Sequence, residues 1–199
     1  MTVGEMRPTG ADVVADAGVV RIRRKVRTDA FDDYRWRRDP EIARYDGTVP
    51  LTMTFSEFLP LFEHDLAFPD PRKRAFSLDD PEGTHVGNIM YYNVDVAGGS
   101  AEIGVSIAAE AERGHGLGTA AVVAFLRFIW QTLPFRVVFL HTLEWNTRAR
   151  SSFRRAGFDE TARVSREGRW FVRMEARREW WLLHDAEGRF TEERSGGGE

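Results

Sequence analysis

The spacing of hydrophobic and polar residues changes along the chain, and these changes predict the order of its helices and strands. Between Phe55 and Leu66 the apolar positions recur every three or four residues, which is typical of a helix with one buried face. The stretch 120–130 is apolar almost all round and predicts a fully buried helix, whereas the continuous apolar run 137–140 predicts a central strand. Strands are predicted at 19–26, 74–78, 86–92, 102–107, 137–140, 158–164 and 170–174.

Capping residues and breakers place the remaining helices. A helix follows the cap candidate Thr28 and is interrupted by Pro40, and the buried helix begins near Gly118. A short helix covers 147–156, with Asn146 as its cap. The predicted order is β-α-α-β-β-β-α-β-α-β-β. We expect one domain over 18–184, a flexible N-terminal segment over 1–17 and a flexible polar tail over 185–199.

Composition narrows the class of protein without identifying it. The chain has 199 residues, 42% hydrophobic and 30% charged, which is ordinary for a soluble globular domain. It has no cysteine, so disulfides, cysteine metal sites and an acetyl-cysteine intermediate are excluded. No apolar run has the length of a membrane span, and the polar N-terminus lacks the apolar core of a signal peptide, so a cytoplasmic protein without membrane contact is expected. A net charge of −3 gives no support for nucleic-acid binding.

The most informative motif is the glycine-rich run 113–119, which lies between a predicted strand and the buried helix. Glycines at every second position let the backbone approach a ligand, and the helix start directs unpaired N–H groups towards it. The run lacks the Gly-Lys-Ser/Thr ending of a P-loop and the spacing of a dinucleotide fingerprint. It therefore predicts an anion site of another kind, and the alternative is a loop that only turns the chain.

Several motifs together resemble one family. Arg113-x-x-Gly116-x-Gly118 resembles the pyrophosphate loop of the GNAT superfamily of N-acetyltransferases. The resemblance covers about 19–181 and implies a mixed α/β (α+β) fold with a mostly antiparallel, twisted central sheet flanked by helices. Its other landmarks, in chain order, are Trp36 to Tyr45, Glu102-Ile103-Gly104, Asn146-x-x-Ala149, Phe153, Gly157-Phe158 and Glu179-Trp180. The first and last of these resemble the Rim-type branch, which acetylates the N-termini of ribosomal proteins.

The resemblance implies acetyl-CoA as co-substrate and assigns its contacts. Main-chain groups of the splayed fourth strand would bind the pantetheine, and loop residues would bind the pyrophosphate. Asn146 is either a donor contact or only a helix cap. No metal is expected, because neither His115 nor His141 has a metal-binding partner at useful spacing. The predicted donor-binding residues are Val105, Ser106, Ile107, Arg113, Gly114, His115, Gly116, Leu117, Gly118, Thr119 and Asn146.

Direct acetyl transfer requires a neutral amine, so the pKa of the acceptor matters. A lysine-like amine with a pKa of about 10.4 costs about 4.6 kcal/mol to deprotonate at pH 7, and an α-amine costs roughly 1.4 kcal/mol. By the resemblance Glu102 is the candidate base, and the alternative is a solvent-facing strand glutamate. Phe153 has no hydroxyl where many members carry Tyr, so Ser151, Ser152 or a water would have to act as the acid. His115 and His141 are interpreted as incidental.

The acceptor is the least determined part of the function. Residues 40–82 contain nine acids and four bases, a net charge of −5, which favours a cationic amine if these acids line the cleft. The alternative is a solvated surface. The hypothesis is acetylation of a primary amine, either a protein N-terminus or a small cationic molecule. A non-catalytic acyl-CoA sensor or partner-binding module is the second hypothesis, and a homodimer stays open.

Overall fold

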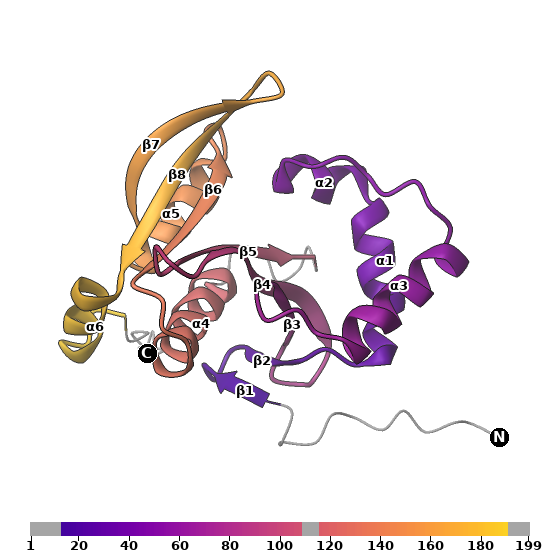
Figure 1. Cartoon of the computed structure of the whole chain (residues 1–199), viewed down its shortest axis with the longest axis horizontal. Helices are drawn as coiled ribbons and strands as arrows, with labels where there is room; N and C mark the ends of the chain where they lie inside the picture. The colour runs from indigo at the N-terminus through magenta and orange to yellow at the C-terminus, as the bar shows by residue number, and fades with distance from the viewer. Residues whose placement is uncertain (1–12, 109–115, 191–199) are drawn as a thin grey trace, which may run out of the picture.

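An eight-stranded sheet organises the molecule in the computed structural model, which describes residues 13–108 and 116–190 (Figure 1). The strand order is β1-β2-β3-β4-β5-β6-β8-β7, and every neighbouring pair is antiparallel except β5 and β6. This arrangement confirms the predicted mixed, mostly antiparallel fold. The strands are β1 (Val13–Asp16), β2 (Arg21–Arg24), β3 (Arg74–Asp79), β4 (His85–Asp95), β5 (Ser100–Ile107), β6 (Val137–Leu143), β7 (Asp159–Arg166) and β8 (Arg169–Arg177).

Helices cover both faces of the sheet. A short 3-10 turn over Arg27–Asp29 leads into the first helix, and Asp39 separates the first two helices because its side chain caps the second, where Pro40 takes the first position. The α-helices are α1 (Ala30–Arg38), α2 (Pro40–Asp46), α3 (Phe55–Ala67), α4 (Leu117–Thr132), α5 (Thr147–Arg155) and α6 (Arg178–Ala186). Figure 1 shows α1, α2 and α3 gathered on one side of the molecule and the β7–β8 hairpin projecting from the other.

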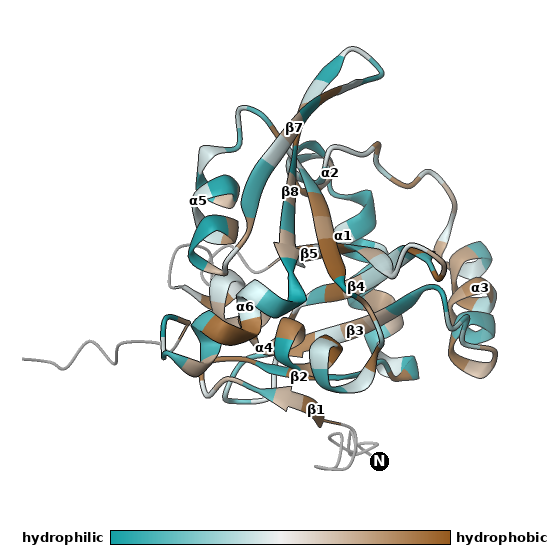
Figure 2. Ribbon diagram, turned by 60° about the vertical axis from the view of Figure 1, so that its left-hand side comes forward, coloured by the Kyte–Doolittle hydropathy of each residue, from teal (hydrophilic) through white to brown (hydrophobic). Residues whose placement is uncertain are grey.

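The main hydrophobic core lies between α4 and one face of the sheet. Phe125 and Trp130 of α4 are fully buried, and Phe76 of β3 packs edge-on against Phe125 at a ring-centroid distance of 5.5 Å. Figure 2 shows the contrast between hydrophobic residues on α4 and the hydrophilic surface of α5. The apolar stripe of α3 packs instead against α1, in a second cluster that contains Tyr34 and Phe58. Both predicted helical stripes are therefore core surfaces.

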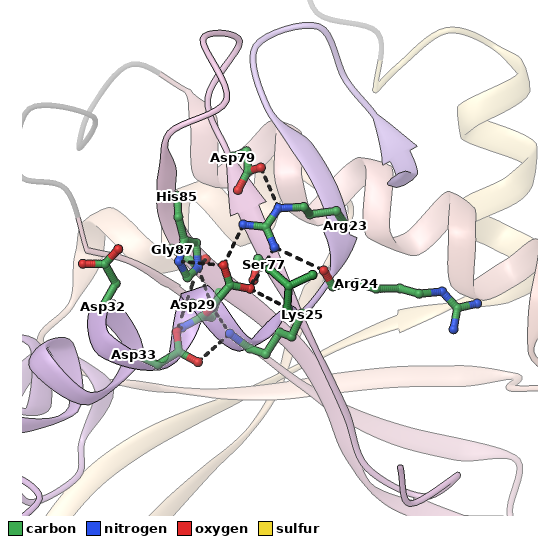
Figure 3. A network of polar contacts seen from close by, with 12 residues as sticks. Arg23, Arg24, Lys25, Asp29, Asp32, Asp33, Ser77, Asp79, His85 and Gly87 are labelled. Carbon is green, nitrogen blue, oxygen red and sulfur yellow. Dashed lines mark hydrogen bonds and ion pairs between the residues drawn. The ribbon is translucent and has the colours of Figure 1, made fainter. Parts of the chain in front are cut away.

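The opposite face of the sheet carries a buried polar network beneath α1 (Figure 3). Arg23 of β2 donates to both oxygens of Asp29 at 2.8 Å and to Asp79 at 2.7 Å. Ser77 of β3 also donates to Asp29. Burial opposes ionisation of Asp29, but the hydrogen bonds from Arg23 and the charge of His85 outweigh it and lower the pKa of Asp29 to about 2. The network thus fixes α1 against three strands.

Both ends of the described chain extend beyond the predicted 18–184 domain. Val13–Asp16 is a strand paired with β2, although 1–17 was expected to be flexible. The unpredicted helix α6 continues to Ala186, and its Asp185 pairs with Arg127 of α4 at 2.6 Å. Phe190 stacks on Trp181. Asp185 and Arg127 lie far apart in the sequence, so local composition gave no signal for the packing of α6 on α4.

Candidate functional site

A fork in the sheet creates the candidate site. The parallel strands β5 and β6 pair over only three residue pairs of the described chain, the last of which joins Glu102 to Phe139. Beyond this point β5 continues to Ile107 and β6 to Leu143 as the two strands diverge. An interior strand edge with exposed backbone groups is thereby available to an extended, amide-containing ligand.

The pairing of β5 with β4 decides which of its backbone groups face the fork. The Ala108 N–H donates to the Val86 carbonyl at 2.9 Å. Because hydrogen-bonded and non-hydrogen-bonded pairs alternate in an antiparallel ladder, Ser106 also directs its backbone groups towards β4, whereas Val105 and Ile107 direct theirs away from it. The predicted donor contacts of Val105 and Ile107 fit this geometry, and the backbone of Ser106 does not.

The start of α4 provides an anion site next to the fork. Gly116 precedes the helix with φ +82°, and a Cβ placed on it would meet no described atom within 4 Å. The first backbone bond of the helix is from Ala120 N–H to the Gly116 carbonyl, and no side chain caps the first turn. The N–H groups of Leu117, Gly118 and Thr119 therefore lack an acceptor among the described residues, as a pyrophosphate would require. The predicted contacts of Arg113, Gly114 and His115 lie outside the described residues.

Helix α5 borders the same helix start. The hydroxyls of Thr119 and Ser152 lie 2.7 Å apart, so Ser152 is beside the first turn of α4. Asn146 caps α5 by accepting from the Ala149 N–H at 3.1 Å, which supports the capping interpretation of this residue. Phe153 packs with Phe158 on the main core, so the position of the family's Tyr is used here for packing. The acid role of Ser152 stays a prediction.

Glu102 lies at the point where the fork opens and is only 4% exposed. It is therefore not the solvent-facing glutamate of the alternative interpretation. One carboxylate oxygen accepts from Nδ1 of His141 at 2.7 Å, and the other accepts from the side-chain amide of Asn93 at 2.8 Å. Burial first, and then the charge of Glu102 and a hydrogen bond to it, raise the pKa of Tyr92, so this hydroxyl keeps its proton. Each oxygen of the candidate base is thus already occupied.

His141 is the residue that sequence reasoning missed. It lies on β6 across the fork from Glu102, and its side chain is only 6% exposed. Arg166, at the end of β7, donates to its Nε2 at 3.1 Å. In the sequence His141 interrupts a strand whose other residues are mostly apolar, and this was the only signal for it. Because its partner is 39 positions away, the pair became visible only in the folded chain.

The acids of residues 40–82 divide between the neighbourhood of the fork and other places. Asp46 acts electrostatically on Tyr92 beside Glu102, and Asp70 lines a hollow together with Tyr92 and Asn93. Three others lie elsewhere. Glu57 forms the capping box of α3, Glu63 pairs with Arg27, and Asp79 belongs to the network beneath α1. A hollow of about 390 Å³ near the end of β6 is instead lined by two basic and five other residues. They are Pro40, Arg44, Thr48, Pro50, Leu143, Trp145 and Arg169.

The described residues contain neither a membrane-spanning helix nor a cluster of metal-binding side chains. No helix within 13–108 and 116–190 is long and apolar enough to cross a membrane. The same part of the chain contains no group of three or more histidine, aspartate or glutamate side chains arranged to hold a metal ion.

Solved structures of acetyltransferases share this fold. The spermidine N-acetyltransferase from Vibrio cholerae, in complex with CoA and spermine, matches with a TM-score of 0.73 at 20% identity, over 82% of this chain and 98% of that chain. The spermidine/spermine N-acetyltransferase from Vibrio cholerae, in complex with manganese ions, matches with a TM-score of 0.70 at 18% identity, over 84% and 98%. At these identities the likeness establishes the fold.

The family of this chain is identified from its sequence by the match to a family model. No curated protein matched the chain. The family model described as "Acetyltransferase (GNAT) domain" matches residues 20–159, which is more than half of the chain. The match spans the fork, the helix start and α5. This chain therefore belongs to the GNAT family of acetyltransferases, and it transfers an acetyl group from acetyl-CoA to an amine.

Proposed function

We propose that the acceptor is a small cationic primary amine of the polyamine class and that the acetyl group passes to it directly in a ternary complex. The supporting observation is the buried carboxylate of Glu102 at the point where β5 and β6 diverge. Its described partners are His141, Asn93 and Tyr92, and no described Lys or Arg side chain forms an ion pair with it. A buried negative charge without a cationic partner favours the approach of an ammonium group.

The hydrogen-bonded pair of Glu102 and His141 provides a group that can accept a proton. The primary amines of a polyamine are largely protonated at neutral pH, so they need a group that accepts a proton before attack. The solved structures similar to this chain include enzymes whose names specify spermidine and spermine, which supports the same acceptor class. The glycine run and the uncapped start of α4 would hold the donor pyrophosphate, and the backbone of Val105 and Ile107 would hold the pantetheine.

A second class of acceptor, a peptide N-terminus, is supported by a hollow beside β6. The hollow beside β6 combines the guanidinium groups of Arg44 and Arg169 with the apolar surfaces of Leu143 and Trp145. Such a lining fits the first residues of a peptide that carries an acidic side chain. The resemblance of the first helix to the Rim-type branch points to the same class. An α-amine also makes the smaller demand on a base.

A thiol-release assay with acetyl-CoA separates these proposals. The acceptors would be spermidine, a short diamine, an amine of the same length in which a carboxylate replaces the second amine, and peptides with acidic or neutral second residues. We expect spermidine and the diamine to give the highest kcat/KM at low ionic strength. A preference for the carboxylate-bearing amine or the acidic peptide would overturn the polyamine proposal in favour of the second class. Acetyl-CoA binding without thiol release from any acceptor would support the sensor hypothesis instead.

A further inference from the structure

We propose that His141 is the residue that takes the proton from the acceptor amine and that Glu102 is a positioning residue that orients the imidazole and stabilises its protonated form. This inference rests on the proposed function, because it concerns the same acceptor site. It reassigns the base role that the family resemblance gives to Glu102. A hydrogen bond of 2.7 Å joins Nδ1 of His141 to Oε1 of Glu102.

The hydrogen bonds of His141 determine which nitrogen carries the proton. Glu102 can only accept at this bond, so Nδ1 bears the hydrogen and donates it. Arg166 can only donate, so Nε2 presents its lone pair at the 3.1 Å contact. These contacts define the Nδ1–H tautomer, with the lone pair of Nε2 on the side opposite the carboxylate. A carboxylate on Nδ1 fixes the ring and favours the positive charge that develops when Nε2 accepts a proton.

Glu102 is unsuited to direct contact with the amine because its other oxygen is also occupied. Asn93 donates to Oε2, and the residue is buried to 4% exposure. The contact at Nε2, in contrast, is made by Arg166, an exposed side chain at the end of the β7–β8 hairpin. An exposed arginine can rotate into solvent, and this would free the lone pair of His141 Nε2 for the ammonium group of the acceptor. The path for the proton thus leads through the histidine.

The surroundings of the imidazole are mixed in charge. Beyond Glu102, the titratable and charged groups nearby are Tyr92 from β4, Asp46 from α2, which acts electrostatically on Tyr92, Arg166 from β7, and Arg173, the cross-strand partner of His141 on β8. Arg173 lies over the ring of Phe139 and is paired with Glu175, so part of its charge is compensated. Arg166 is the cation closest to Nε2. An acceptor ammonium that displaces it replaces one positive charge by another that can release a proton.

The reaction balances with this assignment. The ammonium group gives one proton to Nε2, and the resulting amine nitrogen forms a bond to the thioester carbonyl carbon. The carbon–sulfur bond breaks, and CoA leaves with the electron pair as a thiolate. The thiolate takes the second proton that the nitrogen loses, directly or through water. The imidazolium of His141 then releases its proton to solvent, and the enzyme returns to its starting state.

Kinetics of His141→Gln test the proposal. Its amide can still donate to Glu102, so the fold is expected to persist, but it cannot accept a proton at the position of Nε2. We expect kcat/KM for a strongly basic primary amine to fall by roughly 10²- to 10⁴-fold, and the acid limb of the pH–rate profile to disappear. The acetyl-CoA Kd should stay within twofold of the wild-type value. The matched control is His184→Gln on α6, where an exposed imidazole stacks on Trp180, and it should behave as wild type.

A second acceptor distinguishes catalysis from structural support. A primary amine made weakly basic by an adjacent nitrile is neutral at the assay pH and needs no base before attack. The loss in His141→Gln should therefore be at least tenfold smaller with this amine. An equal loss with both amines, or wild-type activity with the strongly basic amine, would overturn the assignment. Wild-type turnover of the same amines tests the proposed function separately.

Two further measurements keep the proposal testable if His141→Gln does not fold. Nitrogen-15 NMR of the wild-type imidazoles should show His141 with its proton on Nδ1, and a proton on Nε2 would overturn the proposal. Glu102→Gln keeps an acceptor for Nδ1 but removes the charge, so it should reduce kcat/KM less than His141→Gln does while leaving a weakened acid limb. A larger loss in Glu102→Gln would return the base role to the carboxylate.

Discussion

Replacement of Gly116 by alanine should separate the cost of backbone strain from the loss of donor binding. Gly116 has φ +82° and open space around the position of a Cβ. An alanine there adopts a left-handed conformation that costs about 1–2 kcal/mol, with no steric clash against any described atom. In a chain of this size each kcal/mol lowers Tm by about 2–4 °C, so we expect a fall of roughly 2–8 °C.

The matched control for this change is Gly83→Ala. Gly83 lies in the turn between β3 and β4 with φ +87°, and a Cβ on it would also meet nothing within 4 Å. Its substitution should cost the same stability. Only Gly116 precedes the uncapped first turn of α4, so only its new methyl group can hold a pyrophosphate away from the N–H groups there.

The expected effect on affinity follows from the hydrogen bonds involved. One hydrogen bond from a backbone N–H to a charged oxygen contributes about 1.5–3 kcal/mol, and each 1.4 kcal/mol is a factor of ten in Kd. Loss of one such bond in Gly116→Ala should therefore raise the acetyl-CoA Kd about 10- to 100-fold, as measured by calorimetry. Gly83→Ala should bind like wild type. An unchanged Kd in Gly116→Ala, or an equal rise in both variants, would refute the assignment of the helix start as the pyrophosphate site.

Three predictions concern stability. Arg23→Met leaves two buried carboxylates without their guanidinium and should lower the free energy of unfolding by about 3–5 kcal/mol in urea titrations, whereas Arg27→Met, which breaks an exposed pair, should cost less than about 1 kcal/mol. The pKa of Asp29 is lowered from 3.8 to about 2, so the ionised side chain contributes about 2 kcal/mol to the free energy of unfolding above pH 4. This contribution is lost as the pH falls towards 2. The urea midpoint should therefore decline across this range, and it should decline less steeply in Asp29→Asn. Gly157→Ala combines φ +91° with a Cβ 2.7 Å from the ring of Trp181, so thermal unfolding should show a loss of about 2–5 kcal/mol without a change in acetyl-CoA Kd.

Local patterns were sufficient for most elements of this fold. The apolar stripe of α3 and the all-round apolar α4 were predicted correctly because helical periodicity reports directly on burial. The strand β1 and the helix α6 were missed for the opposite reason. The four residues of β1 form too short a segment for a clear alternating pattern and are stabilised by pairing with β2, whereas α6 is held by contacts such as Asp185 with Arg127, 58 positions away.

Some residues of the candidate site could be predicted from local sequence, and others could not. The glycine run and the Glu102 strand were found from short motifs, because close backbone approach to a ligand requires particular residues at fixed spacing. The Glu102–His141 pair required the register of β5 and β6, which sequence spacing does not encode. The acidic excess of residues 40–82 reported position only in part, since Glu57 and Glu63 form a cap and an ion pair elsewhere whereas Asp46 acts on Tyr92 beside Glu102.

The fork also gives the molecule a mechanical property. Three residue pairs join β1–β5 to β6–β8, so the two parts of the sheet meet at a narrow junction. The bond between Glu102 and His141 crosses this junction and is sensitive to its angle. A donor that binds along the interior edge of β5 braces the junction and restricts its motion. Under the assignments proposed above, donor occupancy and proton acceptance by His141 would be coupled, and we expect acetyl-CoA to bind before the amine.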